Sequence, residues 1–364
     1  MILGSHFRKH NNNMFNLQNI LRNNIKNLIP YSSARDEFKG EASVYLDANE
    51  NSFGSPLDVN YNRYPDPIQF KVKQRLSEIK GVPPGNIFLG NGSDEAIDIL
   101  FRAFCRPGVD NVITLPPTYG MYEVSANIND VEVRKIKLNP DYQLDMEGIA
   151  EAIDENTKII FICSPNNPTG NSINRADIET ILANFQGLVV IDEAYINYSR
   201  QKTFIQELTE YANLVVLHTL SKAWGLAGLR LGMAFASQEI IEVFNKVKPP
   251  YNINEASQRI ALEALQNVEQ INNWIKLTVS EREKLINDLG KLELVLKIFP
   301  SDANFILVKT IDAKGIYDHL VNNGIIVRDR SKVELCESSL RITVGTPEEN
   351  KTLITNLKKF SRQK

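Results

Sequence analysis

Short β-rich runs alternate with helical patterns between Gly85 and Ala236, and this alternation restricts the fold more than any other feature of the chain. We expect strands at residues 87–89, 111–115, 131–138, 158–163, 188–192, 214–219 and 231–236. Strands that alternate with helices form parallel sheets with helices on their faces. The sequence therefore predicts an α/β fold, in which a mostly parallel sheet flanked by helices forms the larger part of the molecule.

A smaller domain is expected beyond this region. The prolines of Lys248-Pro-Pro-Tyr-Asn252 interrupt the pattern, as at a stiff junction between domains. From Asn254 we expect one helical stretch through Trp274 to Leu296, followed by alternating segments near residues 304–309, 325–327 and 340–344. These segments predict a small α+β domain of residues 41–57 and 249–364, beside a large domain of residues 58–248 and an N-terminal leader and arm of residues 1–40.

Composition and charge exclude several classes of function. The 41 basic and 44 acidic side chains are interspersed, so the chain has no basic stripe that would bind nucleic acid. No apolar run approaches the roughly 18 residues of a membrane span. Residues 1–13 are polar, unlike a secretory signal, and Met14 is an alternative start. Cys105, Cys163 and Cys336 are odd in number and widely spaced, which argues against a disulfide framework or a zinc knuckle and fits the reducing cytoplasm.

Lys222 and Asp192 lie thirty residues apart, one just after an expected strand and the other at the end of one. A lysine amine forms a Schiff base with an aldehyde cofactor, and a buried carboxylate can keep a pyridine nitrogen protonated. Asp192 ends a run that is expected to be buried on both faces, where it needs a cationic partner. Together the two residues suggest pyridoxal phosphate chemistry. A surface lysine and a polar strand end are the alternative interpretation, although Trp224 and Leu226 argue against a solvated surface.

Two groups of residues suit the phosphate of such a cofactor. The turn of residues 90–94 contains two glycines and opens an expected helix, and a helix N-terminus with nearby glycines binds phosphate well. A simpler interpretation of this turn is that Ser93 or Asp94 caps the helix. Two hydroxyls and a guanidinium near the lysine can also bind phosphate, those of Thr219, Ser221 and Arg230.

Further candidate residues follow other expected strands. Asn167 lies in a proline-bounded turn directly after the strand of residues 158–163, and loops at the carboxyl ends of parallel strands form the sites of α/β folds. Its amide could donate to a phenolic oxygen of the cofactor, which Tyr195 could also reach. Tyr119 could stack on the pyridine ring, and Tyr64, outside the regular pattern, could serve a neighbouring subunit. A plain turn and a core aromatic are the alternatives for Asn167 and Tyr119.

With these residues in view, the chain resembles the fold-type I pyridoxal-phosphate-dependent aminotransferases, and among them the histidinol-phosphate aminotransferase family. The resemblance extends from about Leu28 to the end of the chain. It is carried by residues 46–51, 62–65, 90–95, 117–122, 163–170, 192–195, 219–230, 327–329 and 340–346. The subfamily depends on Tyr31-Ser-Ser-Ala-Arg35 and on the late arginines Arg328 and Arg341. Where the family often has Asn-Ala-Asn-Glu, this chain has Asp47-Ala-Asn-Glu50.

The resemblance implies a role for each candidate residue. Lys222 would form the Schiff base, and Asp192 would pair with the pyridinium nitrogen. Asn167 and Tyr195 would bond the phenolic oxygen, and Tyr119 would stack on the ring. The other cofactor-binding residues would be Gly92, Ser93, Asp94, Thr219, Ser221, Arg230 and, reaching the other subunit's site in a homodimer, Tyr64. The substrate-binding residues would be Tyr31, Asn49, Arg328 and Arg341, and no metal ion is implied.

The implied reaction moves an amino group between glutamate or 2-oxoglutarate and histidinol phosphate or imidazole-acetol phosphate, in histidine biosynthesis. Lys222 would carry a proton between the substrate Cα and the cofactor. Arg328 and Arg341 would hold the phosphate dianion of histidinol phosphate. Three alternatives stay open: an aminotransferase for aromatic or other 2-oxo acids, a pyridoxal-phosphate-dependent decarboxylase of a phosphorylated amino acid, and a catalytically silent cofactor-binding protein.

Overall fold

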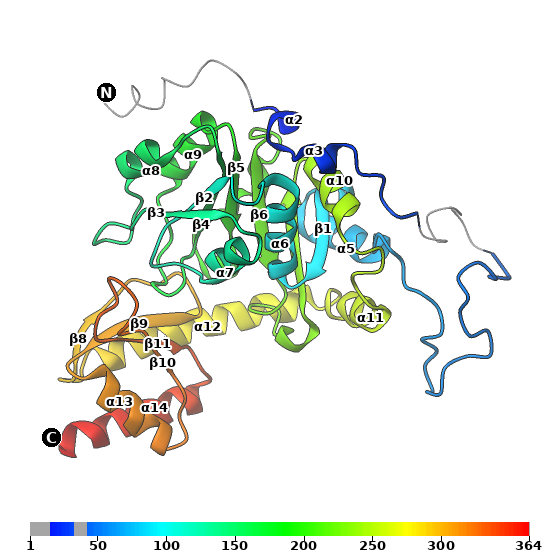
Figure 1. Cartoon of the computed structure of the whole chain (residues 1–364). Helices are drawn as coiled ribbons and strands as arrows, with labels where there is room; N and C mark the ends of the chain where they lie inside the picture. Colours follow the sequence, from blue (N-terminus) through cyan, green and yellow to red (C-terminus); the bar gives the residue numbers. More distant parts are fainter. Residues whose placement is uncertain (1–14, 33–41, 364) are drawn as a thin grey trace.

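A computed structural model describes residues 15–32 and 42–363, so the expected leader of residues 1–13 and the alternative start at Met14 lie outside the described residues. Two sheets organise the described chain (Figure 1). The larger contains β1 Ile87–Asn91, β2 Asn111–Thr114, β3 Glu132–Lys135, β4 Thr157–Cys163, β5 Leu188–Asp192, β6 Leu214–Thr219 and β7 Leu231–Ala236. Their order in space is β1-β7-β6-β5-β4-β2-β3.

The larger sheet is mostly parallel, as predicted. Neighbouring strands from β3 through β2, β4 and β5 to β6 pair in parallel, whereas β7 pairs antiparallel with both β6 and β1. The strand expected at residues 131–138 is shorter than predicted. The N–H groups of Ile136 and Leu138 nevertheless donate to carbonyl oxygens of Thr114 and Pro116, so the chain continues alongside β2. Every expected strand of the larger sheet is present.

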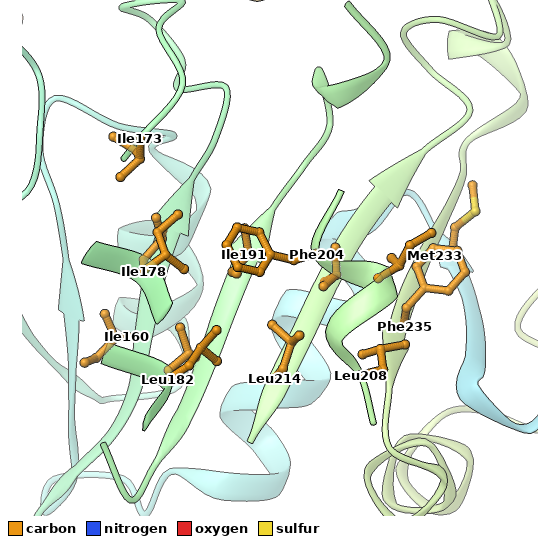
Figure 2. Packing of buried hydrophobic residues seen from close by; sticks show 14 of the residues in the cluster. Ile160, Ile173, Ile178, Leu182, Ile191, Phe204, Leu208, Leu214, Met233 and Phe235 are labelled. Atoms are coloured by element: carbon orange, nitrogen blue, oxygen red, sulfur yellow. The ribbon is translucent and has the colours of Figure 1, made fainter. Parts of the chain in front are cut away.

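Helices cover both faces of this sheet because its strands are apolar on both sides. One face carries α6 Ser93–Phe104, α7 Met121–Ile128, α10 Gln238–Val247 and the short helices α2 Leu17–Ile20 and α3 Asn23–Lys26. The other carries α5 Phe70–Lys80, α8 Met146–Ala152, α9 Arg175–Asn184 and α11 Glu255–Ala264. Alternate residues of β5 divide between the two faces, with Leu188 and Val190 in one buried cluster and Val189 and Ile191 in the other. Figure 2 shows part of the second cluster, between the strands and α9.

The smaller sheet is antiparallel and lies beside the carboxyl ends of the parallel strands (Figure 1). It contains β8 Val295–Ile298, β9 Phe305–Thr310, β10 Arg328–Asp329 and β11 Ser339–Thr343, in the order β10-β11-β9-β8. Helices α12 Val268–Leu289, α13 Ala313–Asn322 and α14 Pro347–Gln363 share a separate buried cluster with it. The predicted small α+β part is therefore present. Short 3-10 helices complete the described elements: η1 Pro84–Asn86, η2 Ile196–Tyr198, η3 Phe204–Glu207 and η4 Ala227–Leu229.

The prediction of a single helical stretch from Asn254 to Leu296 is wrong. The stretch is two helices, α11 and α12, because the chain turns at Leu265, whose side chain is buried in the core of the larger sheet. The stretch also ends early, since Leu294 leads into β8 and packs in the core of the smaller sheet. The segment expected at residues 325–327 is displaced to β10. The division into domains at residue 248 stays a prediction, although α11 packs against α5 of the larger part.

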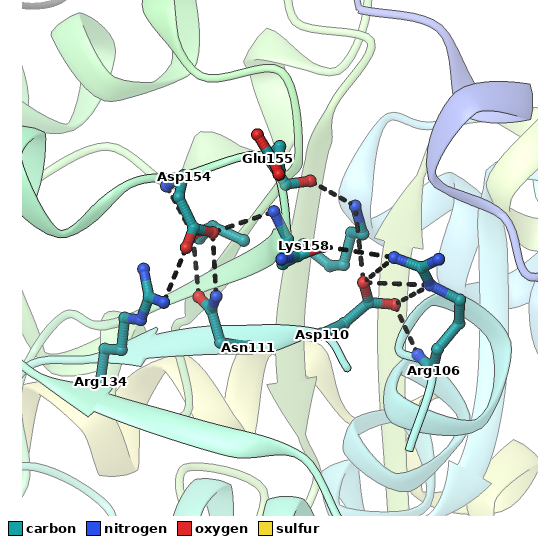
Figure 3. Close-up of polar contacts among 9 residues, drawn as sticks. Arg106, Asp110, Asn111, Arg134, Asp154, Glu155 and Lys158 are labelled. Carbon is teal, nitrogen blue, oxygen red and sulfur yellow. Dashed lines mark hydrogen bonds and ion pairs between the residues drawn. The ribbon is translucent and has the colours of Figure 1, made fainter. Parts of the chain in front are cut away.

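The amino ends of β2 and β4 carry charges that are paired within the protein (Figure 3). Arg106 Nη2 lies 2.7 Å from an oxygen of Asp110, and Arg134 Nη2 lies 2.7 Å from an oxygen of Asp154. Lys158 Nζ donates to the Glu155 carbonyl oxygen at 2.8 Å. These three basic side chains therefore have partners within the protein. None of the helices in the described residues is long and apolar enough to cross a membrane.

Candidate active site

A cavity of about 620 Å³ opens at the carboxyl ends of β4, β5 and β6. This is where ligands bind in α/β sheets, because the loops that follow neighbouring parallel strands converge there. It collects residues from the larger sheet and from two strands of the smaller one. Of the residues predicted from the sequence, those that line it are Gly92, Ser93, Asp94, Tyr119, Asn167, Asp192, Tyr195, Thr219, Ser221, Lys222, Arg230, Arg328 and Arg341.

Asp192 is a buried acid that lines this cavity. It ends β5, is 3% exposed, and accepts hydrogen bonds from the Tyr122 hydroxyl at 2.7 Å and from the Ala194 N–H at 3.1 Å. Burial raises its pKa to about 6, although these two hydrogen bonds act in the opposite direction. Within the described chain no arginine or lysine forms an ion pair with it. The charge of Lys222 also lowers this pKa, but without a direct ion pair the carboxylate can still accept a cation.

Lys222 faces the same cavity from the loop after β6. Its Nζ lies 5.5 Å from the centre of the Tyr195 ring. The side chain is exposed in the open cavity, yet loss of surrounding water lowers its pKa, and the nearby Arg341 guanidinium lowers this pKa further. A lowered pKa increases the share of neutral amine, which is the form that attacks an aldehyde or removes a proton.

The turn before α6 forms a backbone cradle. Gly92 has a φ of 74°, in the region that favours glycine, and its N–H donates to the Arg230 carbonyl oxygen at 2.8 Å. Gly232 of β7 packs against this turn so closely that an added Cβ would lie 2.2 Å from the Ser93 nitrogen. No side chain caps the start of α6, so the alternative in which Ser93 or Asp94 serves as a helix cap is wrong. The first N–H groups of the helix are thus available to an anion.

The donors of this cradle suit a phosphate group. Arg230 Nη2 lies 3.6 Å from Oδ2 of Asp94, and the Tyr119 hydroxyl donates a hydrogen bond to Oδ1 of the same carboxylate at 3.1 Å. The Thr219 hydroxyl oxygen accepts from the Ser221 N–H at 3.0 Å, which fixes the loop that leads to the lysine. Backbone N–H groups, hydroxyls and a guanidinium converge here, as phosphate recognition requires.

Asn167 connects the two sheets inside the cavity. Its Nδ2 lies 3.5 Å from the Tyr195 hydroxyl, and its Oδ1 accepts a hydrogen bond from Arg341 of β11. The neighbouring Asn166 holds the loop, since its Nδ2 donates to the Pro117 carbonyl oxygen at 2.8 Å. A residue predicted to bind the cofactor and one predicted to bind the substrate are therefore in direct contact.

Tyr64, Asn49 and Tyr31 lie outside this cavity in the single chain. Tyr64 and Asn49 line a second cavity of about 570 Å³, where the Tyr64 ring stacks on Tyr251 with centres 4.5 Å apart. Tyr31 lines another cavity and is 75% exposed. The rest of the motif that begins at Tyr31, residues 33–35, lies outside the described residues.

Two further residues contribute to the site without a distinct signal in the sequence: Tyr122 beneath it and Arg330 in its lining. Tyr122 lies three residues after Tyr119 on α7, and only the folded structure brings its hydroxyl to Asp192. Arg330 lines the cavity together with Arg328, two residues earlier. That spacing places alternate side chains of a strand on one side, and it is the only indication that the sequence offers. Among the described residues no group of side chains could hold a metal ion.

A model of the aminotransferase class I and II family matches residues 47–357. The match covers most of the chain, and the chain belongs to this family.

Within the family, the chain is most readily compared with proteins named histidinol-phosphate aminotransferase. That of Parabacteroides distasonis is 54% identical over 345 residues, which cover 95% of this chain and 99% of the relative. That of Cytophaga hutchinsonii is 55% identical over 346 residues, with coverage of 95% and 99%. The solved histidinol-phosphate aminotransferase from Sinorhizobium meliloti, in complex with pyridoxal-5'-phosphate, has a TM-score of 0.74 at 24% identity and covers 87% of this chain and 90% of that one. At this identity the structural likeness shows the fold.

Proposed function

We propose that the protein is a pyridoxal-phosphate-dependent aminotransferase that moves an amino group between glutamate and histidinol phosphate, in histidine biosynthesis. Near full-length similarity to relatives of that name supports the substrates. One observation carries the chemistry: the buried Asp192, which forms no ion pair in the described chain, faces the same cavity as Lys222, whose pKa is lowered. We also propose that the protein works in the cytoplasm, where its buried free cysteines would stay reduced.

The residues present fit the cofactor. The turn at Gly92 and Ser93 with Arg230 would hold its phosphate, and Asp192 would hold its ring nitrogen. Asn167 and Tyr195 would bond its phenolic oxygen. When bound, the cofactor supplies a protonated ring that withdraws electrons from the substrate Cα.

Lys222 performs the proton transfers in this proposal. Its amine would take the proton from the substrate Cα and return it at the cofactor C4′ carbon, a general acid/base task for which a lowered pKa is suited. Asp192 would keep the ring nitrogen protonated, and the hydroxyl of Tyr122 holds that carboxylate in place. Arg328 and Arg341, opposite each other on β10 and β11, hold the anionic end of the substrate.

We further propose a homodimer in which Tyr64 reaches the phosphate in the other subunit's site. The segment before α5 leaves large apolar side chains uncovered in the single chain, namely Val44, Leu46, Phe53, Leu57 and Tyr64. Uncovered apolar side chains gathered along one segment are typical of a protein interface. Asn49 lies in the same exposed cavity as Tyr64 and would be brought to a site by the same contact.

Replacement of Lys222 by alanine tests the function. We expect at least about a 1000-fold loss of transamination, because the proton carrier and the Schiff-base amine are both removed. The measurement is 2-oxoglutarate formation from glutamate with imidazole-acetol phosphate, together with the visible absorbance of the bound cofactor. Lys202→Ala, at an exposed lysine, is the control and should keep the wild-type rate.

Normal turnover by Lys222→Ala would refute the assignment. Assays of the wild-type protein separate the alternatives. A higher rate with phenylpyruvate than with imidazole-acetol phosphate would favour an aminotransferase for aromatic 2-oxo acids. Release of carbon dioxide from a phosphorylated amino acid without 2-oxoglutarate would favour a decarboxylase.

A further inference from the structure

We propose that Arg330 is a third substrate-binding arginine, which makes the cavity selective for a phosphate dianion over a carboxylate. The inference rests on the proposed function and adds a residue to the site. Arg330 directly follows β10, and its N–H donates to the Ser339 carbonyl oxygen at 2.9 Å, so it continues the pairing of β10 with β11. Arg328 and Arg330 are two residues apart in extended chain and both line the cavity. Arg341 faces Arg328 across the same strand pair.

Among the described residues no carboxylate forms an ion pair with Arg330, and the charge of Asp329 is the smallest of the effects that raise its pKa. Its Nε is buried and has no hydrogen-bond acceptor there. The nearest acid in sequence, Asp329, accepts a hydrogen bond from the Ser331 N–H at 2.8 Å. A buried guanidinium N–H without an acceptor is unfavourable in a folded protein. A structural arginine would be expected to have a protein acceptor, so this absence points to a ligand.

The three guanidiniums also repel one another. Burial lowers the pKa of Arg330, and the charge of Arg328 lowers it further. Burial likewise lowers the pKa of Arg341, followed by the charge of Arg330. Cys336, Tyr195 and Asp329 raise the pKa of Arg330, and Tyr195 alone raises that of Arg341. The Tyr195 hydroxyl is neutral unless it loses its proton. The cluster is therefore stabilised when an anion enters the cavity.

The number of guanidiniums indicates which anion fits. A carboxylate has one charge and two oxygens, which a single guanidinium fork satisfies. A phosphate monoester has close to two charges and three terminal oxygens, so it can accept from several forks at once. Glutamate and histidinol phosphate must both use this cavity in the proposed reaction. A third arginine thus contributes far more to the binding of the phosphorylated substrate than to the binding of glutamate.

The test compares Arg330→Gln with wild-type holoenzyme in two separate half-reactions, each followed by the absorbance change of the cofactor. We expect kcat/KM for histidinol phosphate to fall about 30- to 100-fold, because charge-assisted hydrogen bonds to the phosphate are lost. With glutamate the fall should be less than about 3-fold. The matched control is Lys332→Gln, which removes a nearby exposed positive charge that does not line the cavity. It should change neither half-reaction by more than about 2-fold.

Equal losses for both substrates, or no loss with histidinol phosphate, would overturn the inference. Arg330→Lys carries the test if Arg330→Gln does not fold, because it keeps the charge and removes the fork. Its loss should be smaller and again confined to the phosphorylated substrate; a loss shared equally by glutamate would contradict the assignment.

Inorganic phosphate provides a probe that does not depend on histidinol phosphate being the substrate. It should compete with glutamate in the wild-type holoenzyme, and Arg330→Gln should raise its inhibition constant about 10-fold. An unchanged constant would overturn the inference. If the wild-type protein ignores histidinol phosphate while the phosphate effect is found, the proposed function fails and the third arginine stands.

Discussion

Asp192 destabilises the cofactor-free protein because its carboxylate is buried, and the same burial prepares it to bind the cofactor. Its pKa of about 6 in the folded protein lies above the ordinary value of about 4, because the carboxyl is buried. The folded chain therefore binds the proton more tightly than the unfolded chain does. Below about pH 4 both states are protonated and no penalty exists; above about pH 6 the ionised group costs the cofactor-free protein about 3 kcal/mol.

Asp192→Asn should therefore stabilise the cofactor-free protein at neutral pH. We expect a gain of about 1–2 kcal/mol in the free energy of unfolding at pH 7.5, since the amide avoids the buried charge and can still accept from Tyr122. The gain should disappear as the pH falls through 6 towards 4. Thermal unfolding of the cofactor-free proteins at several pH values measures this. A variant less stable than wild type at pH 7.5 would show that the ionised carboxylate is adequately solvated.

At the scale of elements, the fit of β7 against the turn before α6 determines the shape of the phosphate cradle. Gly232 pairs with Gly90 of β1 and with Thr219 of β6, so β7 lies between the turn and the strand that leads to Lys222. An added Cβ would approach the Ser93 nitrogen to 2.2 Å and the Gly92 carbonyl carbon to 2.3 Å. These are backbone atoms, which cannot yield without moving the turn.

Gly232→Ala should weaken cofactor binding by at least about 30-fold and destabilise the protein by about 1–3 kcal/mol, because the turn must shift. Gly228→Ala is the matched control, since a Cβ there meets no atom within 4 Å. Titration of the cofactor-free proteins with pyridoxal phosphate, followed by absorbance, measures the affinity. Equal affinity of both variants would mean that the turn adapts at little cost.

The strands of the larger sheet could be predicted because each is a short apolar run bounded by turn residues. Their carboxyl ends meet, so Asn167, Asp192 and Lys222 could be predicted to share a site. Other features depend on tertiary packing. The turn at Leu265 interrupts a pattern that is helical on both sides, since burial of this side chain outweighs local helix propensity. The contact of Tyr122 with Asp192 joins residues seventy positions apart and leaves no trace in local sequence.

At the scale of the whole molecule, the position of Tyr64 leaves two ways in which this residue could reach an active site. In the single chain it lies in a different cavity from Lys222, stacked on Tyr251. A contribution to a site therefore requires either a large movement of the segment before α5 or a second copy of the chain. In the proposed homodimer, the second copy of the chain provides this contact.

Mixing two variants, each of which lacks one of these residues and is expected to be inactive, distinguishes these arrangements. Lys222→Ala keeps Tyr64, and Tyr64→Ala keeps Lys222, so a hybrid dimer contains one intact site if Tyr64 crosses between subunits. Equal amounts, unfolded and refolded together, should recover about one quarter of the wild-type sites, because about half of the dimers are hybrids with one intact site each. Activity no greater than that of the separate variants would place Tyr64 at its own subunit's site or at none.

The anion-binding arginines and the reactive lysine stand on different sheets. Arg328, Arg330 and Arg341 belong to the strand pair β10–β11 and its continuation, while Lys222 follows β6 of the larger sheet. Substitutions in the small strand pair can therefore alter which substrate binds and leave the catalytic Lys222 in place. Substrate specificity and catalysis therefore depend on different elements of the fold. Related chains can change the first through the small strand pair while they keep the second.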